Sequence, residues 1–227
     1  MNQRRTRLSY GLLDVSAPQL VVYGAGGFAR EACWLAEACP EAGVVMAMID
    51  DDPARHASVN GIQVCGLEEA RRRFPSARMV VAIGSPQHRA AAVERAAAAG
   101  FTFASLIHPR SERSRWIQMG EGTVICAGSI LTTNIRIGRQ VHINLACTLG
   151  HDVVLGDFVT LAPGVNLSGR VRVGDRAYVG TNASIINGEA DAPIVIGEDA
   201  VIGAAACVTR SVAAGTTVVG VPARPRG

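Results

Sequence analysis

The chain has 227 residues, of which 48% are hydrophobic, 18% are charged and 25 are glycine. This length allows one large domain or two small ones, and the composition excludes a disordered chain, a collagen and a coiled coil. No apolar run is long enough to span a membrane, and residues 1–5 lead into no signal-peptide core. We therefore expect a cytoplasmic protein with no membrane partner.

All 22 basic residues are arginine, because the sequence contains no lysine. Enzyme classes that need a lysine, such as pyridoxal enzymes and Walker-type NTPases, are therefore excluded. Arginines and acids are spread evenly along the chain, so no nucleic-acid-binding face is predicted. The six cysteines contain no Cys-x-x-Cys pair, and we expect buried free thiols, with neither disulfides nor a metal site.

The first half of the chain alternates β-rich runs with helical stretches. Strands are expected at residues 20–23, 44–49, 79–83 and 101–107, and helices at about 28–39, 67–73 and 87–99. Such alternation predicts an α/β domain with a small parallel, Rossmann-like sheet and right-handed crossovers.

The second half has a period of six residues. An aliphatic residue or methionine stands at every sixth position from Met119 to Ile185, and glycine often follows it. The phase breaks at residues 187–193 and resumes at Ile196. An α-helix repeats near 3.6 residues and cannot carry this period, whereas a β-solenoid can, because each hexad forms one short strand and one turn with the aliphatic anchor inside.

The period of six predicts a left-handed parallel β-helix, with residues 187–193 as a loop leaving one corner. We place the boundary so that residues 1–108 form the α/β domain and residues 109–227 form the β-helix. An open solenoid face lined with apolar side chains favours a homotrimer.

The first expected strand ends in Gly24-x-Gly26-x-x-Ala29, a pattern typical of nucleotide-binding loops. Glycines let the backbone approach a diphosphate, and the following helix stabilises the charge with its N-terminus. Asp50, at the end of the next strand, is placed for a ribose hydroxyl or a base. The alternative is a glycine-rich turn with no ligand.

His151 and Asp152 form the second candidate site. His151 stands two positions after the anchor Leu149, so we expect it to project outward from a corner of the solenoid. An imidazole takes up a proton near neutral pH, and an adjacent carboxylate fixes its tautomer; the alternative is a solvated turn. Asn144 follows its anchor where glycine is usual, either as a site residue or because asparagine tolerates a positive φ. His142 is expected to be structural.

Several motifs together resemble one family. They are Gly24-Ala25-Gly26-Gly27-Phe28-Ala29-Arg30-Glu31, Asp50-Asp51, Ala82-Ile83-Gly84, Ile107-His108-Pro109, Asn144 to His151-Asp152, and Val219-Gly220-Val221-Pro222-Ala223. From about Leu20 onward the chain resembles the bacterial sialic-acid O-acetyltransferase and nucleotide-amino-sugar N-acetyltransferase family.

The resemblance implies a trimer that binds acetyl-CoA between adjacent solenoids and a nucleotide sugar at the N-terminal domain. It implies His151 as general base, Asp152 as its acidic helper, and a backbone amide of Gly169 that faces the thioester oxygen, with Asn144 as a further catalytic candidate. The implied contacts with CoA are Thr160, Gly169, Gly180, Thr181, Gly203 and Ala204. The implied contacts with the nucleotide sugar are Gly26, Gly27, Phe28, Asp50, Asp51, Gly84 and Ser85. Phe28 and Thr160 depart from the family, since some members have histidine at these positions.

The expected function is acetyl transfer from acetyl-CoA to an amino group, at C4, of a UDP- or GDP-linked deoxyamino sugar in surface-glycan biosynthesis. One alternative is O-acetylation of a sialic-acid-like sugar. The other is a non-catalytic trimer that binds a nucleotide sugar.

Overall fold

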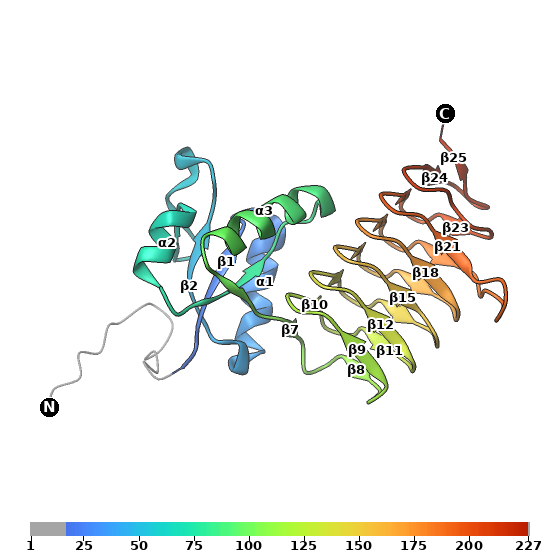
Figure 1. The fold of residues 1–227 in the computed structure, drawn as a ribbon, viewed down its shortest axis with the longest axis horizontal. Helices are drawn as coiled ribbons and strands as arrows, with labels where there is room; N and C mark the ends of the chain where they lie inside the picture. The colour runs from blue at the N-terminus through green and yellow to red at the C-terminus, as the bar shows by residue number, and fades with distance from the viewer. Residues whose placement is uncertain (1–16, 227) are drawn as a thin grey trace, which may run out of the picture. The chain divides into compact units, whose positions relative to one another are not determined.

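The computed structural model describes residues 17–226, and the first five residues examined for a signal peptide lie outside this range. The described chain folds into two compact units (Figure 1). The first contains residues 17–83 and 92–104, and the second contains residues 84–91 and 105–226. The second unit thus includes a short segment that lies well before the predicted boundary at residue 108.

The first unit is built on a six-stranded sheet with the order β3-β4-β2-β1-β5-β6. Neighbouring strands are parallel except β3 and β4, which form an antiparallel edge. The elements are β1 (Gln19–Tyr23), α1 (Gly27–Glu37), η1 (Pro40–Ala42), β2 (Val44–Ile49), η2 (Pro53–Arg55), β3 (Ser58–Val59), β4 (Ile62–Cys65), α2 (Leu67–Arg73), β5 (Arg78–Val81) and β6 (Thr102–Phe103), while α3 (Pro86–Ala98) has residues in both units.

The second unit is a left-handed parallel β-helix with three faces. Face I contains β7 (Leu106–Ile107), β10 (Val124–Ile125), β13 (His142–Ile143), β16 (Thr160–Leu161), β19 (Tyr178–Val179), β22 (Val201–Ile202), β24 (Thr217–Val219) and the antiparallel β25 (Arg224–Pro225). Face II contains β8 (Glu112–Arg113), β11 (Ile130–Leu131), β14 (Thr148–Leu149), β17 (Asn166–Leu167), β20 (Ser184–Ile185) and β23 (Cys207–Val208). Face III contains β9 (Ile117–Met119), β12 (Ile135–Ile137), β15 (Val154–Leu155), β18 (Val171–Val173) and β21 (Ile194–Ile196).

The anchors explain why this sequence forms coils. In register, His142 pairs with Thr160 and Thr160 with Tyr178, so one coil takes 18 residues and three hexads. From β10 to β23 the last residue of each strand is an anchor, and these anchors, from Ile125 to Val208, join one continuous buried core. Burying each such aliphatic side chain stabilises the fold by about 1.5–3 kcal/mol.

The corners have a fixed backbone pattern. The third residue after an anchor has a positive φ, as in Asp152 (+62°) and Arg170 (+57°). The glycine directly after an anchor is needed for space: a Cβ on Gly150 would lie 2.7 Å from the backbone nitrogen of Gly169 in the next coil. Asn144 is not among the residues with positive φ, so tolerance of that conformation does not explain this asparagine.

Two expectations about the strands were wrong. The predicted strand 101–107 is two strands, because β6 pairs with β5 of the first unit whereas β7 pairs with β10 and begins the solenoid. The coils therefore start at Leu106, before the first anchor identified at Met119. The sequence analysis also missed β3 and β4, which contain only two and four residues.

The break in the period is an insertion at one corner. Between Tyr178 and Val201 one coil takes 23 residues instead of 18, yet face III closes normally, with Val171 paired to Ile194. The extra residues lie between β20 and β21 (Figure 1). The predicted corner loop at residues 187–193 is confirmed.

Three further findings concern residues 17–226. None of their helices is long and apolar enough to cross a bilayer. No cluster of three or more histidine, cysteine or acidic side chains in this range could hold a metal ion. All six cysteines are free thiols; five are buried as expected, and Cys207 is half-buried because it faces outward on face II.

Candidate active site

The glycine-rich turn after β1 contains one glycine that the backbone requires, Gly24, and one that has open space beside it, Gly26. Gly24 has φ +125°, and a Cβ there would lie 2.8 Å from the carbonyl oxygen of Ala82, so only glycine fits. Gly26 has no protein atom within 4 Å of the position a Cβ would take. The backbone at Gly26 is therefore accessible to a ligand.

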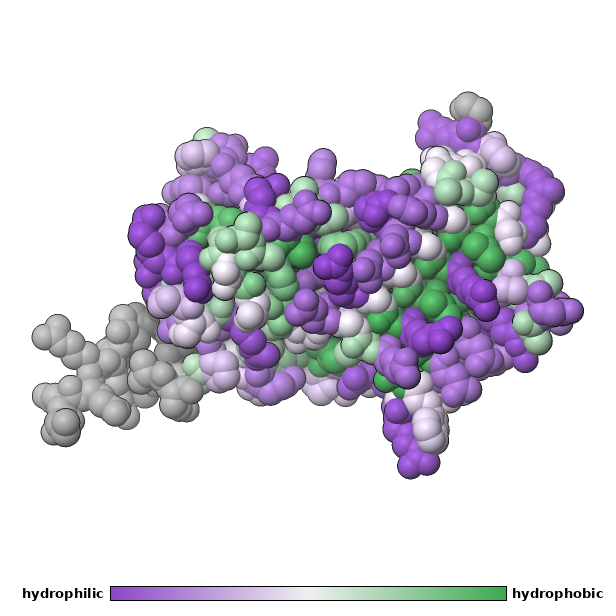
Figure 2. Space-filling view, in the orientation of Figure 1, coloured by the Kyte–Doolittle hydropathy of each residue, from purple (hydrophilic) through white to green (hydrophobic). Residues whose placement is uncertain are grey.

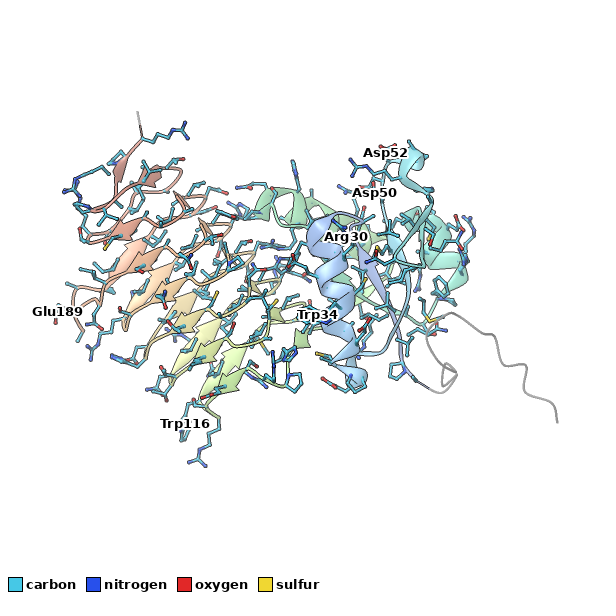
Figure 3. All side chains as sticks on the ribbon, turned by 180° about the vertical axis from the view of Figure 1, so that it is seen from behind. Arg30, Trp34, Asp50, Asp52, Trp116 and Glu189 are labelled. Atoms are coloured by element: carbon cyan, nitrogen blue, oxygen red, sulfur yellow. The ribbon has the colours of Figure 1, made fainter. Side chains whose placement is uncertain are left out.

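Gly26 is also the N-cap of α1, and it provides no side chain to bind the free amides of the first turn. That turn contains no acid, and the guanidinium of Arg30 lies 3.9 Å from the Cβ position of Gly27. Arg30 lies on the same side of the unit as Asp50 and Asp52 (Figure 3). Free amides, the helix dipole and an arginine together favour an anion at this position.

Asp50 and Asp51 follow β2 but have different surroundings. The carboxylate of Asp51 accepts a hydrogen bond from the Tyr23 hydroxyl (2.6 Å) and another from Arg95 (2.7 Å). Burial raises the pKa of Tyr23, and the hydrogen bond to Asp51 adds to the effect, so the phenol keeps its proton. The Asp50 carboxylate accepts a hydrogen bond from the backbone amide of Asp52 (3.0 Å), and its Oδ2 lies 3.6 Å from a guanidinium nitrogen of Arg55. The Asp50 side chain is also less exposed than that of Asp51, at 13% against 55%.

The other residues predicted to contact the nucleotide sugar lie on different elements. Phe28 is half-buried and packs against the hydrophobic cluster under α1. Gly84 and Ser85 precede α3 in the segment that belongs to the second unit. Gly84 has open space at its Cβ position, and the Ser85 hydroxyl accepts the amide of His88 (3.4 Å).

His151 and Asp152 lie at the corner between faces II and III. Their side chains are 45% and 44% exposed, and His151 Nδ1 lies 2.8 Å from Asp152 Oδ2. The hydrogen bond from His151 is the largest cause of a lowered pKa of Asp152, which Asn134 and Arg170 also lower. Because an ionised carboxylate can only accept a hydrogen bond, Nδ1 carries the proton. The neutral ring therefore presents the lone pair of Nε2.

Gly169 lies next to this imidazole, one coil further along. A Cβ on Gly169 would lie 2.5 Å from His151 Nε2 and 2.8 Å from Asn187 Oδ1. His151, Gly169 and Asn187 occupy the same corner position in three successive coils, each two residues after its anchor. Among the described residues, the Gly169 N–H donates to no acceptor. The predicted oxyanion donor therefore stands beside the predicted base.

Four of the six predicted CoA contacts lie at another corner. Gly180, Thr181, Gly203 and Ala204 follow β19 and β22, at the corner between faces I and II. Asn144 lies at the same corner, buried, and donates from Nδ2 to the carbonyl of Leu161 (2.8 Å). The structure brings His151, Asp152 and Gly169 together, but face II separates them from Asn144 and the other four.

Thr160 lies apart from both groups, buried on face I under the guanidinium of Arg89. Its hydroxyl accepts from Arg89 (3.0 Å) and donates to the carbonyl of Gly84 (3.3 Å), so a contact with CoA stays a prediction. Arg89 NH1 lies 3.1 Å from Nδ1 of His142, which is buried as part of this cluster. Burial lowers the pKa of Arg89 to about 9, and the group is still a cation at neutral pH.

The sequence analysis missed Arg30, Arg89 and Asn187 as candidate residues. A signal for Asn187 existed, because it follows His151 by 36 residues, which is two full coils. Arg89 had no such signal, since its partners lie on distant coils of the solenoid.

Comparisons with known proteins show which family the chain belongs to. Residues 19–96 match the model of the PglD N-terminal domain family. The chain is 34% identical over 207 residues to GDP-perosamine N-acetyltransferase of Escherichia coli O157:H7, covering 89% of this chain and 94% of that protein. The chain belongs to the nucleotide-amino-sugar N-acetyltransferases of the hexapeptide-repeat family.

Two solved structures are similar over nearly the whole acetyltransferase. One is a histidine variant of perosamine N-acetyltransferase from Caulobacter crescentus in complex with CoA and GDP-perosamine, with TM-score 0.84 and 32% identity over 92% of this chain and 97% of that one. The other is the acetyltransferase domain of PglB from Neisseria gonorrhoeae in complex with acetyl coenzyme A, with TM-score 0.83 and 31% identity over 93% and 100%. The protein is thus an acetyl-CoA-dependent N-acetyltransferase that acts on a nucleotide amino sugar.

Proposed function

We propose that the enzyme acetylates the C4 amino group of a GDP-linked deoxyamino sugar, with His151 as general base. The pair of His151 and Asp152 carries the proposal, because it presents a basic nitrogen at an exposed corner beside Gly169. The choice of GDP over UDP rests on two relatives. One is a GDP-perosamine N-acetyltransferase and the other was solved with GDP-perosamine bound, and the match covers 94% and 97% of their lengths.

The reaction forms one bond and breaks one. The amine nitrogen attacks the thioester carbon, the C–N bond forms, and the C–S bond breaks to release CoA. His151 Nε2 takes a proton from the nitrogen as positive charge develops there, and the proton leaves with the thiolate as CoA thiol. The Gly169 N–H would donate to the carbonyl oxygen as it becomes negative, an interaction worth about 3 kcal/mol in comparable sites.

The positions of the two groups support a homotrimer. Base and oxyanion donor lie at the corner between faces II and III, whereas four of the predicted CoA contacts, Gly180, Thr181, Gly203 and Ala204, lie at the corner between faces I and II. The two groups of one chain therefore lie at different corners. In a threefold assembly, one corner of each chain would lie against the other corner of the next chain, so that a site would combine both groups. Apolar residues gather on the solenoid surface (Figure 2), and Ile130, Ile186 and Val195 are 39–41% exposed, as suits an interface with a second copy.

The test is acetyl-CoA turnover against a panel of GDP- and UDP-linked 4-amino sugars and the corresponding 4-hydroxy sugars. We expect the GDP-amino sugar to have the highest kcat/KM. Turnover only with the 4-hydroxy sugars would establish O-acetylation, and no turnover with any would favour a binding protein.

The same assay tests the base. His151→Ala should lower kcat by about 10²–10⁴-fold with small effects on either KM, because a positioned base contributes that much to proton transfer. Asp152→Asn should lower kcat less, since it weakens the base without removing it. Near-normal kcat in His151→Ala would exclude the histidine as base.

A further inference from the structure

Asn187 presents an unused hydrogen-bond acceptor beside the base. Its Oδ1 lies 2.8 Å, and His151 Nε2 lies 2.5 Å, from the one point that a Cβ of Gly169 would occupy. The two acceptors therefore both lie close to the Gly169 backbone, His151 on the coil before it and Asn187 on the coil after it. Asn187 Oδ1 accepts no hydrogen bond from any described residue.

The asparagine amide is held in this orientation by the start of the insertion. Asn187 Nδ2 donates to the carbonyl of Gly188 (2.6 Å), which turns Oδ1 toward Gly169. Gly188 in turn donates its N–H to the carbonyl of Gly169 (3.0 Å), and a Cβ on Gly188 would lie 2.5 Å from the carbonyl oxygen of Arg170. Asn187 is therefore fixed to the coil below, although it opens a loop.

We propose that Asn187 selects an amine over a hydroxyl as the acetyl acceptor, an inference that rests on the proposed function. A neutral primary amine has one lone pair and two N–H donors. When one N–H faces His151 Nε2 and the other faces Asn187 Oδ1, the lone pair points away from both acceptors and is free to attack the thioester carbon. A hydroxyl has a single O–H, so it satisfies only His151 and leaves Oδ1 without a donor.

Asn187 is exposed in the single chain, so the preference requires bound substrate to cover Oδ1 and leave that oxygen without a donor when the acceptor is a hydroxyl. Sites that present a polar group discriminate strongly against substrates that leave it unpaired. The insertion that begins at Asn187 is also the only departure from the 18-residue coil between β10 and β23. The structure thus connects the irregular corner directly with the reacting nitrogen.

The experiment compares the GDP-linked 4-amino sugar with its 4-hydroxy counterpart in wild type, Asn187→Leu and Asn187→Asp. Asn187→Leu keeps the size of the side chain but removes the acceptor, and should lower kcat/KM for the amine by roughly 5–30-fold while that for the hydroxyl stays within about twofold. Asn187→Asp keeps an acceptor oxygen and should retain most of the amine preference. The KM for acetyl-CoA should not change in either variant.

Glu189→Gln is the matched control, because Glu189 lies in the same insertion at the outer edge of the solenoid (Figure 3) and is exposed. It should leave both substrates unaffected. Equal losses for amine and hydroxyl in Asn187→Leu, with an unchanged melting temperature, would overturn the proposal and leave Asn187 a structural role. If wild type itself shows no turnover that depends on His151, the proposed function fails first, and the two failures are distinguished.

Discussion

Gly169 shows how one missing side chain defines the reaction site. The imidazole of His151 occupies the space where any other residue would place its Cβ. Gly169 is buried, and its φ does not lie in the left-handed region, so glycine is required here for space and not for backbone conformation. The base is positioned as much by this absence as by the hydrogen bond to Asp152.

Gly169→Ala should therefore impair catalysis more than folding. The new methyl group would force the His151 ring away and break its 2.8 Å contact with Asp152. We expect kcat to fall about 10²-fold, with a melting temperature close to that of wild type. Ser168→Ala, at the exposed neighbouring position, serves as the control and should keep normal kcat. An unchanged kcat in Gly169→Ala would show that the ring does not occupy this place in the working enzyme.

At the scale of elements, Arg89 explains why the start of α3 belongs to the solenoid unit. Its guanidinium is fully buried and donates to the carbonyls of Gln140 and Phe158 and to the hydroxyl of Thr160. Burying a cation is costly unless its donors are satisfied, and here backbone oxygens from two successive coils satisfy them. The arginine thus holds the first residues of α3 against face I.

Replacing this residue should destabilise the protein strongly. Arg89→Leu leaves several buried carbonyls without a donor, and Arg89→Lys restores only part of the contacts because an ammonium lacks the planar fork. We expect Arg89→Leu to lower the free energy of unfolding by about 3 kcal/mol or more, measured by urea denaturation. Arg72→Leu, an exposed arginine on α2, should change it by less than about 0.5 kcal/mol. Equal effects of the two substitutions would contradict the role of Arg89.

The elements also show what a sequence can and cannot predict. Every sixth residue must enter the core of a triangular coil, so the anchors, the corner loop and the outward position of His151 were all legible from spacing. The division of residues 101–107 into β6 and β7 was not, because Phe101 to Ile107 is a nearly continuous apolar run with no turn signal. The partners of Arg89 depend on how a helix packs on coils 51–71 residues away, and local pattern contains no information about that packing.

At the scale of the whole molecule, the two corners predict complementation between defective chains. His151→Ala damages the corner between faces II and III, and Thr181→Trp would block the corner between faces I and II at an exposed position. If each site in a homotrimer combines one corner from each of two chains, refolding the two inactive variants together should restore up to roughly a quarter of wild-type activity.

Sedimentation should show a trimer for wild type, for each variant and for the mixture. A mixture that forms trimers but stays inactive would place both groups of residues in the same chain. A fully active monomer would exclude the shared site altogether.

At the insertion between faces II and III, the residues that stack as coils are constrained by their strand pairing, whereas the residues of the loop are not. The coils above and below it pair as regularly as the others, with Ser184 opposite Cys207 and Val171 opposite Ile194. Residues past Gly188 can therefore vary in length and chemistry without disturbing the stacking that holds His151 and Gly169. A solenoid enzyme of this kind could exchange the short loop beyond Gly188 for another, while the corner that holds His151, Gly169 and Asn187 is inherited intact.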